Sequence, residues 1–123
     1  MKLKAEAPTG ANTFTGYGEG FVMVNQQRYE RSLVVTPDLI WTEWGASTFE
    51  ALAESHFEAL LPLESDVLIL GTGNRLRFPH PRLTRALAAA RKGLEVMDVP
   101  AACRTYNLLA SEGRMVAAAL LLA

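Results

Sequence analysis

The feature that most constrains the fold is a short, uninterrupted apolar stretch at residues 66–71, Asp-Val-Leu-Ile-Leu-Gly. A run of this length without polar alternation is typical of a strand covered on both faces, as in a parallel sheet. The chain after it is predicted to alternate between helix and strand: a helix from Pro81 that Gly93 ends, a strand at 94–97, a helix capped by Asp98 and a strand at 114–122. Strand–helix–strand connections are right-handed crossovers onto one sheet, so the sequence predicts an α/β fold.

The first 46 residues carry strand signals instead. β-Forming segments at residues 11–17, 21–24, 28–35 and 39–44 predict four strands. Asn25 and Gln26 lie between the second and third of these segments and are expected to form a tight turn. We therefore interpret the chain as a single domain over residues 1–123. Its first part, 1–46, is predicted as a β meander, and its second part, 47–123, as a helix followed by alternating strands and helices.

A capping box predicts the start of the first helix. Ser47 offers a hydroxyl, and Glu50 follows it three residues later, which is the spacing of this motif. Pro62 is expected to end the helix. Within it, Glu50, Glu54 and Glu58 share one face. That row is interpreted as a solvated face, with an acidic docking strip as the alternative.

Composition excludes several classes of protein. The chain has 123 residues and one cysteine, so an intrachain disulfide framework is impossible. No segment resembles a signal peptide, and the apolar run at 115–123 is much shorter than the roughly 20 residues of a membrane span. A cytoplasmic location is therefore expected. The net charge of −1 argues against nonspecific binding to nucleic acid.

The loop after the apolar strand is the candidate ligand site. Ligands of doubly wound sheets bind at the carboxyl ends of such strands, where backbone N–H groups and arginines hold anions. The candidate residues are Gly71, Thr72, Gly73, Asn74, Arg75 and Arg77, with Arg82 and Arg85 nearby. The dinucleotide fingerprint is incomplete, because Leu76 occupies the position of its third glycine, and no Gly-Lys-Ser/Thr phosphate loop follows. The alternative is a glycine-rich turn with a solvated basic rim.

Three further residues could carry chemistry, and each has a structural interpretation. Cys103 falls in the first turns of the helix capped by Asp98, where a reactive thiolate is conceivable, although its alanine neighbours favour packing. His56 and His80 have no ligand-spaced cysteines or carboxylates, so no metal site is expected. The sequence thus contains no complete catalytic motif, and no cofactor is predicted.

Several segments together resemble a family of small domains. They are DVLILGTG at 66–73, GLEVMD at 93–98, TYNLL at 105–109 and EGRMVAAAL at 112–120. The family includes the mitochondrial respiratory complex I assembly factor 3 and uncharacterised bacterial and archaeal proteins. The resemblance implies a three-layer fold, with a central mixed sheet, helices and an N-terminal β layer. The resemblance identifies no catalytic residues in this chain, because the family has no established ones. The mitochondrial members of the family act as assembly factors by binding other proteins, so the resemblance implies a protein-binding role.

The sequence therefore favours a noncatalytic protein-binding or assembly-factor-like protein whose partner is another protein. The alternative is a domain, or an enzyme, that binds an anion or another small molecule at the loop of residues 71–77. Self-association is compatible with both hypotheses, because the last strand is apolar on both faces. Burial of that strand inside the monomer is the simpler account.

Overall fold

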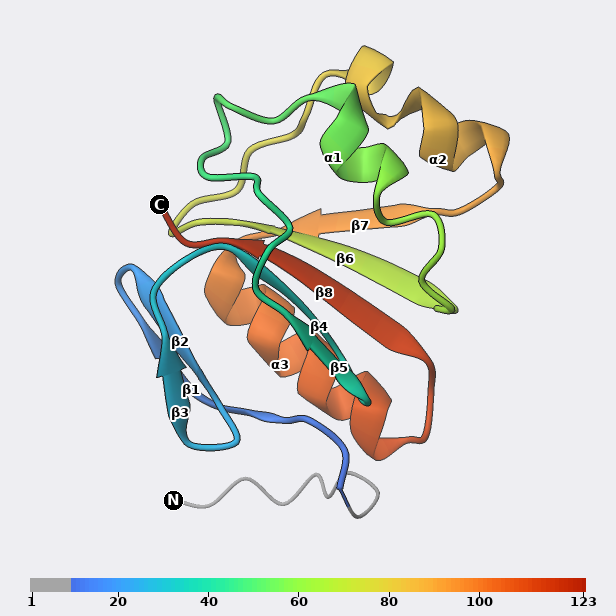
Figure 1. Cartoon of the computed structure of the whole chain (residues 1–123). Coiled ribbons are helices and arrows are strands. Elements are labelled where there is room, and N and C mark those ends of the chain that lie inside the picture. The colour runs from blue at the N-terminus through green and yellow to red at the C-terminus, as the bar shows by residue number, and fades with distance from the viewer. Residues whose placement is uncertain (1–9) are drawn as a thin grey trace.

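The computed structural model describes residues 10–123 and contains two sheets and three α-helices (Figure 1). A three-stranded antiparallel sheet has the order β1-β2-β3. Its strands are β1 (Phe14–Gly18), β2 (Phe21–Val24) and β3 (Gln27–Tyr29). The predicted turn at Asn25 and Gln26 is confirmed, and both residues have positive φ, 52° and 70°, as a two-residue type I′ hairpin requires.

The central sheet is mixed and has the order β5-β4-β8-β6-β7. Its strands are β4 (Leu33–Thr36), β5 (Leu39–Trp41), β6 (Val67–Thr72), β7 (Leu94–Met97) and β8 (Val116–Leu121). β6 is parallel to both of its neighbours, β7 and β8, whereas β8 is antiparallel to β4. All six residues of β8 are buried. The apolar last strand is therefore buried within the monomer.

The two faces of the central sheet carry different layers. On one face lie α3 (Val99–Ser111) and the three-stranded sheet, which share one apolar cluster with alternate residues of β4 and β8. On the other face lie α1 (Glu54–Glu58), the 3-10 turn η1 (Pro81–Thr84) and α2 (Arg85–Ala89). Ala118 and Leu120 face the first layer, and Ala117 and Ala119 face the second. The three-layer α/β fold with a central mixed sheet is thus confirmed.

Two sequence predictions about the first half are wrong. Residues 28–35 form two strands in different sheets, because the chain leaves the small sheet after Tyr29 and enters the central sheet at Leu33. The helix predicted from the capping box begins only at Glu54. The Thr48 hydroxyl accepts from Ala51 N–H in a local turn, and His56 Nδ1 accepts from Ala53 N–H at the true start of α1.

A third correction concerns the end of α2. Gly93 does not end this helix, since the residue with positive φ is Arg91, at 59°. The N–H groups of Arg91 and Lys92 reach back to the carbonyls of Ala88 and Leu87, which is the Schellman pattern. By contrast, the predicted cap of α3 is confirmed, because Asp98 Oδ1 accepts from Ala101 N–H at 2.8 Å.

Two side chains of α3 hold the first strand in place. Asn107 is buried, and its amide accepts from Phe14 N–H at 2.9 Å and donates to Phe14 C=O at 2.8 Å. The Tyr106 hydroxyl donates to the Asn12 carbonyl at 2.9 Å, and its ring packs edge-on against Phe14. Through these contacts α3 fixes where β1 lies.

We predict that Asn107→Ala destabilises the chain, because it leaves both polar backbone groups of Phe14 without their partner. The expected loss is about 2–4 kcal/mol in the free energy of unfolding. Urea unfolding followed by tryptophan fluorescence and by far-UV circular dichroism would measure it, and coincident curves are expected for a single domain. Asn74→Ala is the control, since the exposed Asn74 side chain forms no hydrogen bond within residues 10–123. An equal loss in both variants would contradict the prediction.

Candidate functional site

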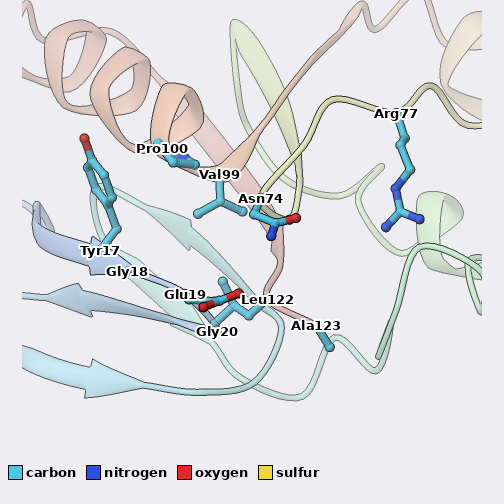
Figure 2. A pocket seen from close by; sticks show the side chains of 11 residues that line it. Tyr17, Gly18, Glu19, Gly20, Asn74, Arg77, Val99, Pro100, Leu122 and Ala123 are labelled. Atoms are coloured by element: carbon cyan, nitrogen blue, oxygen red, sulfur yellow. The ribbon is translucent and has the colours of Figure 1, made fainter.

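A pocket of about 630 Å³ opens at the carboxyl ends of β6, β7 and β8. The loop after β6 leads to α2 on one face of the sheet, and the loop after β7 leads to α3 on the other face. Where two such loops diverge they leave a crevice, and open α/β sheets bind their ligands in this crevice. Its walls come from the hairpin tip at residues 17–20, the loop at 73–77, the first turn of α3 and residues 122–123 (Figure 2).

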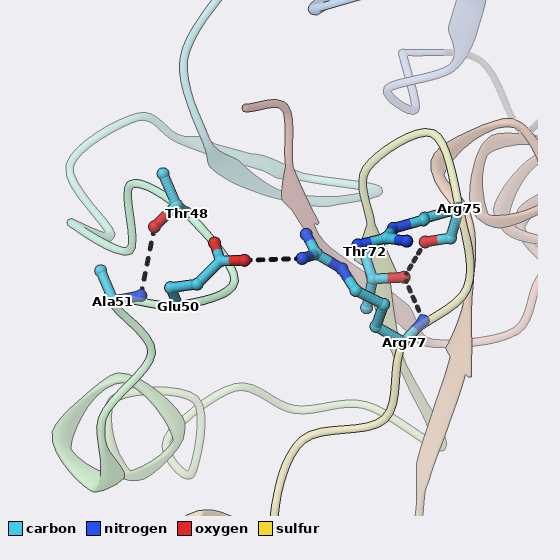
Figure 3. A network of polar contacts seen from close by, with 6 residues as sticks. All are labelled: Thr48, Glu50, Ala51, Thr72, Arg75 and Arg77. Carbon is cyan, nitrogen blue, oxygen red and sulfur yellow. Dashed lines mark hydrogen bonds and ion pairs between the residues drawn. The ribbon is translucent and has the colours of Figure 1, made fainter.

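The first two predicted site residues, Gly71 and Thr72, have structural roles and do not line the pocket. Gly71 lies in β6 opposite Leu120, and a Cβ there would come within 2.7 Å of the Leu120 side chain. Thr72 is fully buried. Its hydroxyl donates to Arg75 C=O at 2.7 Å and accepts from Arg77 N–H at 3.1 Å, so one side chain shapes the loop that follows β6 (Figure 3).

The other predicted residues are divided between the pocket and the outer surface. Gly73, with φ of +84°, and Asn74 line the pocket. The side chain of Arg75 is exposed and does not line it. Arg77 lines the pocket and also forms an ion pair, with its Nη1 at 2.8 Å from Glu50 Oε2 and its guanidinium over the Phe49 ring.

The Glu50–Arg77 pair affects the electrostatics beside the pocket. The pKa of the Glu50 carboxyl lies below its usual value. The largest cause is a hydrogen bond from the Glu50 backbone, and the second is the hydrogen bond from the Arg77 guanidinium. The pair is therefore charged at neutral pH, and the charge of Arg77 is balanced. Glu50 lies before α1, so the predicted row of three glutamates on one helix face is wrong. Glu54 instead pairs with Arg85 at 3.0 Å.

The start of α3 has few N–H groups left for an anion. Val99 N–H donates to the Gly73 carbonyl, and Pro100 has no N–H. Ala101 and Ala102 donate to the side chain and the carbonyl of Asp98. The backbone donors at the start of α3 are thus occupied within the protein.

Sequence reasoning missed the hairpin tip as a wall of the pocket. Tyr17, Gly18 and Gly20 belong to no ligand-binding motif in the sequence. A Cβ at Gly18 would come within 2.3 Å of the Phe21 ring, so the ring would have to move to accommodate any other residue there. The density of glycine at residues 16–20 was the one available clue to a close approach between this turn and another segment.

The histidines and the cysteine have structural roles. His56 Nδ1 caps α1, and His80 Nδ1 accepts from Arg82 N–H at the start of η1. Within residues 10–123 no cluster of three or more His, Cys, Asp or Glu side chains could hold a metal ion. Cys103 lies on the buried face of α3, and burial raises the pKa of its thiol to about 12. The arrangement stabilises the neutral thiol and not a nucleophilic thiolate.

We predict that Cys103 is inert in the folded chain. At pH 8 a disulfide reagent should label it at least about a hundredfold more slowly in buffer than in urea, because thiolate fraction and access both fall on folding. Since the folded-state pKa is raised, the contribution of Cys103 to stability is complete below pH 9 and is lost as the pH rises toward 12. Unfolding free energies of the wild type and Cys103→Ala should therefore converge over this range. Fast labelling of the folded chain would contradict the prediction.

No helix in the part of the chain that the structure describes combines the length and hydropathy needed to cross a membrane.

Among known proteins, the chain is 31% identical to the bovine "NADH dehydrogenase [ubiquinone] 1 alpha subcomplex assembly factor 3" over 97% of its own length and 65% of that protein's. It thus spans just under two thirds of this relative.

Solved structures share the whole fold. A crystal structure of a Bordetella parapertussis protein superposes with a TM-score of 0.84 at 38% identity, covering 92% of this chain and 97% of that one. A solution structure of a Bordetella pertussis protein, described as a Mth938-like domain, gives 0.78 at 32% identity and covers 98% and 92%. The family described as "Protein of unknown function (DUF498/DUF598)" matches residues 14–121, and the chain belongs to this family.

Proposed function

We propose that this chain is a noncatalytic protein-binding domain that acts as an assembly factor. The name of the bovine relative supports the role, since that protein is called an assembly factor. The observation that carries the proposal is a pair of exposed apolar side chains on the loop between β6 and η1. Phe78 is 70% exposed and Leu76 is 50% exposed.

The loop is held in one conformation by contacts that do not involve this pair. The Thr72 hydroxyl bonds to the backbone of two loop residues, and Arg77 is fixed by Glu50 and Phe49. A fixed loop loses little conformational entropy when it binds. Leu76 and Phe78 belong to neither core cluster, so their apolar surface stays in contact with water after folding. A partner that covers this surface would gain free energy of binding from its burial.

The charges around the pair indicate the chemistry of the partner. Arg75 and Arg82 flank the apolar pair, are exposed and form no ion pair within residues 10–123. Aromatic anchors with arginine at their edge are common in protein interfaces. We therefore expect a partner with an apolar socket and an acidic rim. A second copy of this chain is another occupant, which light scattering would reveal as a dimer.

The test is photo-crosslinking in the native host. A benzoyl-phenylalanine at position 78 should crosslink one protein partner, and the same group at position 108 should not. Leu108 is the matched control, because it is also large, apolar and exposed, at 53%, but lies on α3. Identical crosslinked bands from both positions, or none from position 78, would overturn the proposal.

A double substitution tests the same surface quantitatively. Leu76→Ser with Phe78→Ser should weaken partner binding by about a hundredfold, since the loss of two interface anchors costs a few kcal/mol. The midpoint of thermal unfolding should change little, because neither residue belongs to the core. Binding is measured with the crosslinked partner after its identification, and Leu108→Ser is expected to bind as the wild type does.

A further inference from the structure

The pocket at the carboxyl ends of β6, β7 and β8 is separate from the exposed pair that carries the proposed function, because neither Leu76 nor Phe78 lines it. Its volume, about 630 Å³, is in the range of pockets that enclose a ligand. Tyr17 lies at one end and Arg77 at the other, with Asn74 and Val99 between them (Figure 2).

The walls provide room for an apolar side chain. Tyr17, Val99, Pro100 and Leu122 contribute carbon surface from three different segments. Leu122 and Val99 are themselves buried, so this part of the wall is fixed by core packing. The hairpin tip and Gly73 add glycines, which keep the opening free of side chains where a bound chain would run.

The polar groups favour an amide and a cation over an anion. The Asn74 side chain, without a hydrogen bond among residues 10–123, offers one acceptor and two donors, the complement of a peptide group. Glu19 lines the pocket and has no ion-pair partner among the described residues. The charge of Arg77 is balanced by Glu50, and the N–H groups at the start of α3 are occupied. The buried Nε–H of Arg77 has no partner among residues 10–123, so it is available to a neutral acceptor such as a peptide carbonyl. An anion would therefore meet the uncompensated carboxylate of Glu19.

We propose that this pocket binds an extended peptide segment of the protein partner, and the proposal thus rests on the proposed function. An apolar side chain of the segment packs against Tyr17, Val99 and Leu122. A neighbouring backbone amide pairs with Asn74, and a lysine or arginine beside the apolar residue lies near Glu19. The exposed pair and the pocket then recognise two separate features of the same partner.

The test uses the ¹⁵N-labelled chain and the capped peptide acetyl-Ala-Leu-Lys-amide, followed by two-dimensional NMR. Saturable shifts are expected for the backbone amides of Gly18, Gly20, Gly73 and Asn74. Acetyl-Ala-Leu-Glu-amide should bind at least about threefold more weakly, since its charge repels Glu19. Inorganic phosphate, tested in parallel, should leave these amides unshifted.

Variants connect the shifts to the proposed contacts. Asn74→Ala should weaken the lysine peptide by about tenfold, the cost of losing its hydrogen bonds. Glu19→Gln should remove the difference between the lysine and glutamate peptides. Leu108→Ser is the control and should bind as the wild type does. Because Asn74 and Glu19 are both exposed, both variants are expected to fold.

The outcomes separate this proposal from the proposed function. Absence of saturable shifts, equal affinity for the two peptides, or shifts caused by phosphate would overturn the peptide site. If crosslinking from position 78 still succeeds, the assembly role stands without the pocket. If the peptide binds but crosslinking from position 78 fails, the pocket is a peptide site and the proposed assembly role is wrong.

Discussion

The two hydrogen bonds between Asn107 and the backbone of Phe14 are the constraint on which the rest of this architecture depends. They join residues that are 93 positions apart, and they are buried, where an unpaired backbone group is costly. α3 therefore determines the position of β1, and β1 leads into the hairpin tip that forms one wall of the pocket. A single amide side chain on a helix thus links the small sheet to the binding region.

Thr72 performs a similar task on the opposite wall. Its buried hydroxyl orders the loop after β6 so that Gly73, Asn74 and Arg77 line the pocket while Leu76 and Phe78 remain exposed. The same short segment can therefore serve two contacts, one through a concave site and one through projecting side chains. Residues that were candidates for ligand contact, such as Thr72 and Gly71, act as the frame that makes these contacts available.

Local signals predicted the strands β6 and β7 and the start of α3, but not the end of α2. The apolar run of β6, the strand β7 and the Asp98 cap each depend on neighbouring residues alone, and the structure confirms them. The first half depends on distant partners. The run at 28–35 has uniform strand propensity, yet β3 and β4 belong to different sheets. The capping box at residue 47 does not start the helix: Phe49 and Glu50 contact the distant Arg77, and α1 begins only at Glu54. For the pocket, the sequence indicated Gly73, Asn74 and Arg77, whereas the hairpin wall depends on a long-range approach that no local pattern encodes.

The position of β8 has a consequence for synthesis on the ribosome. β8 is the last strand along the chain but the middle strand of the central sheet, where it joins the β5-β4 pair to the β6-β7 pair. Until residue 121 has left the exit tunnel, β8 cannot join the β5-β4 pair to the β6-β7 pair, so the strand edges that it covers lack their partner. The central sheet therefore closes after translation of its final strand, and the growing polypeptide is exposed to aggregation and to chaperones until that moment.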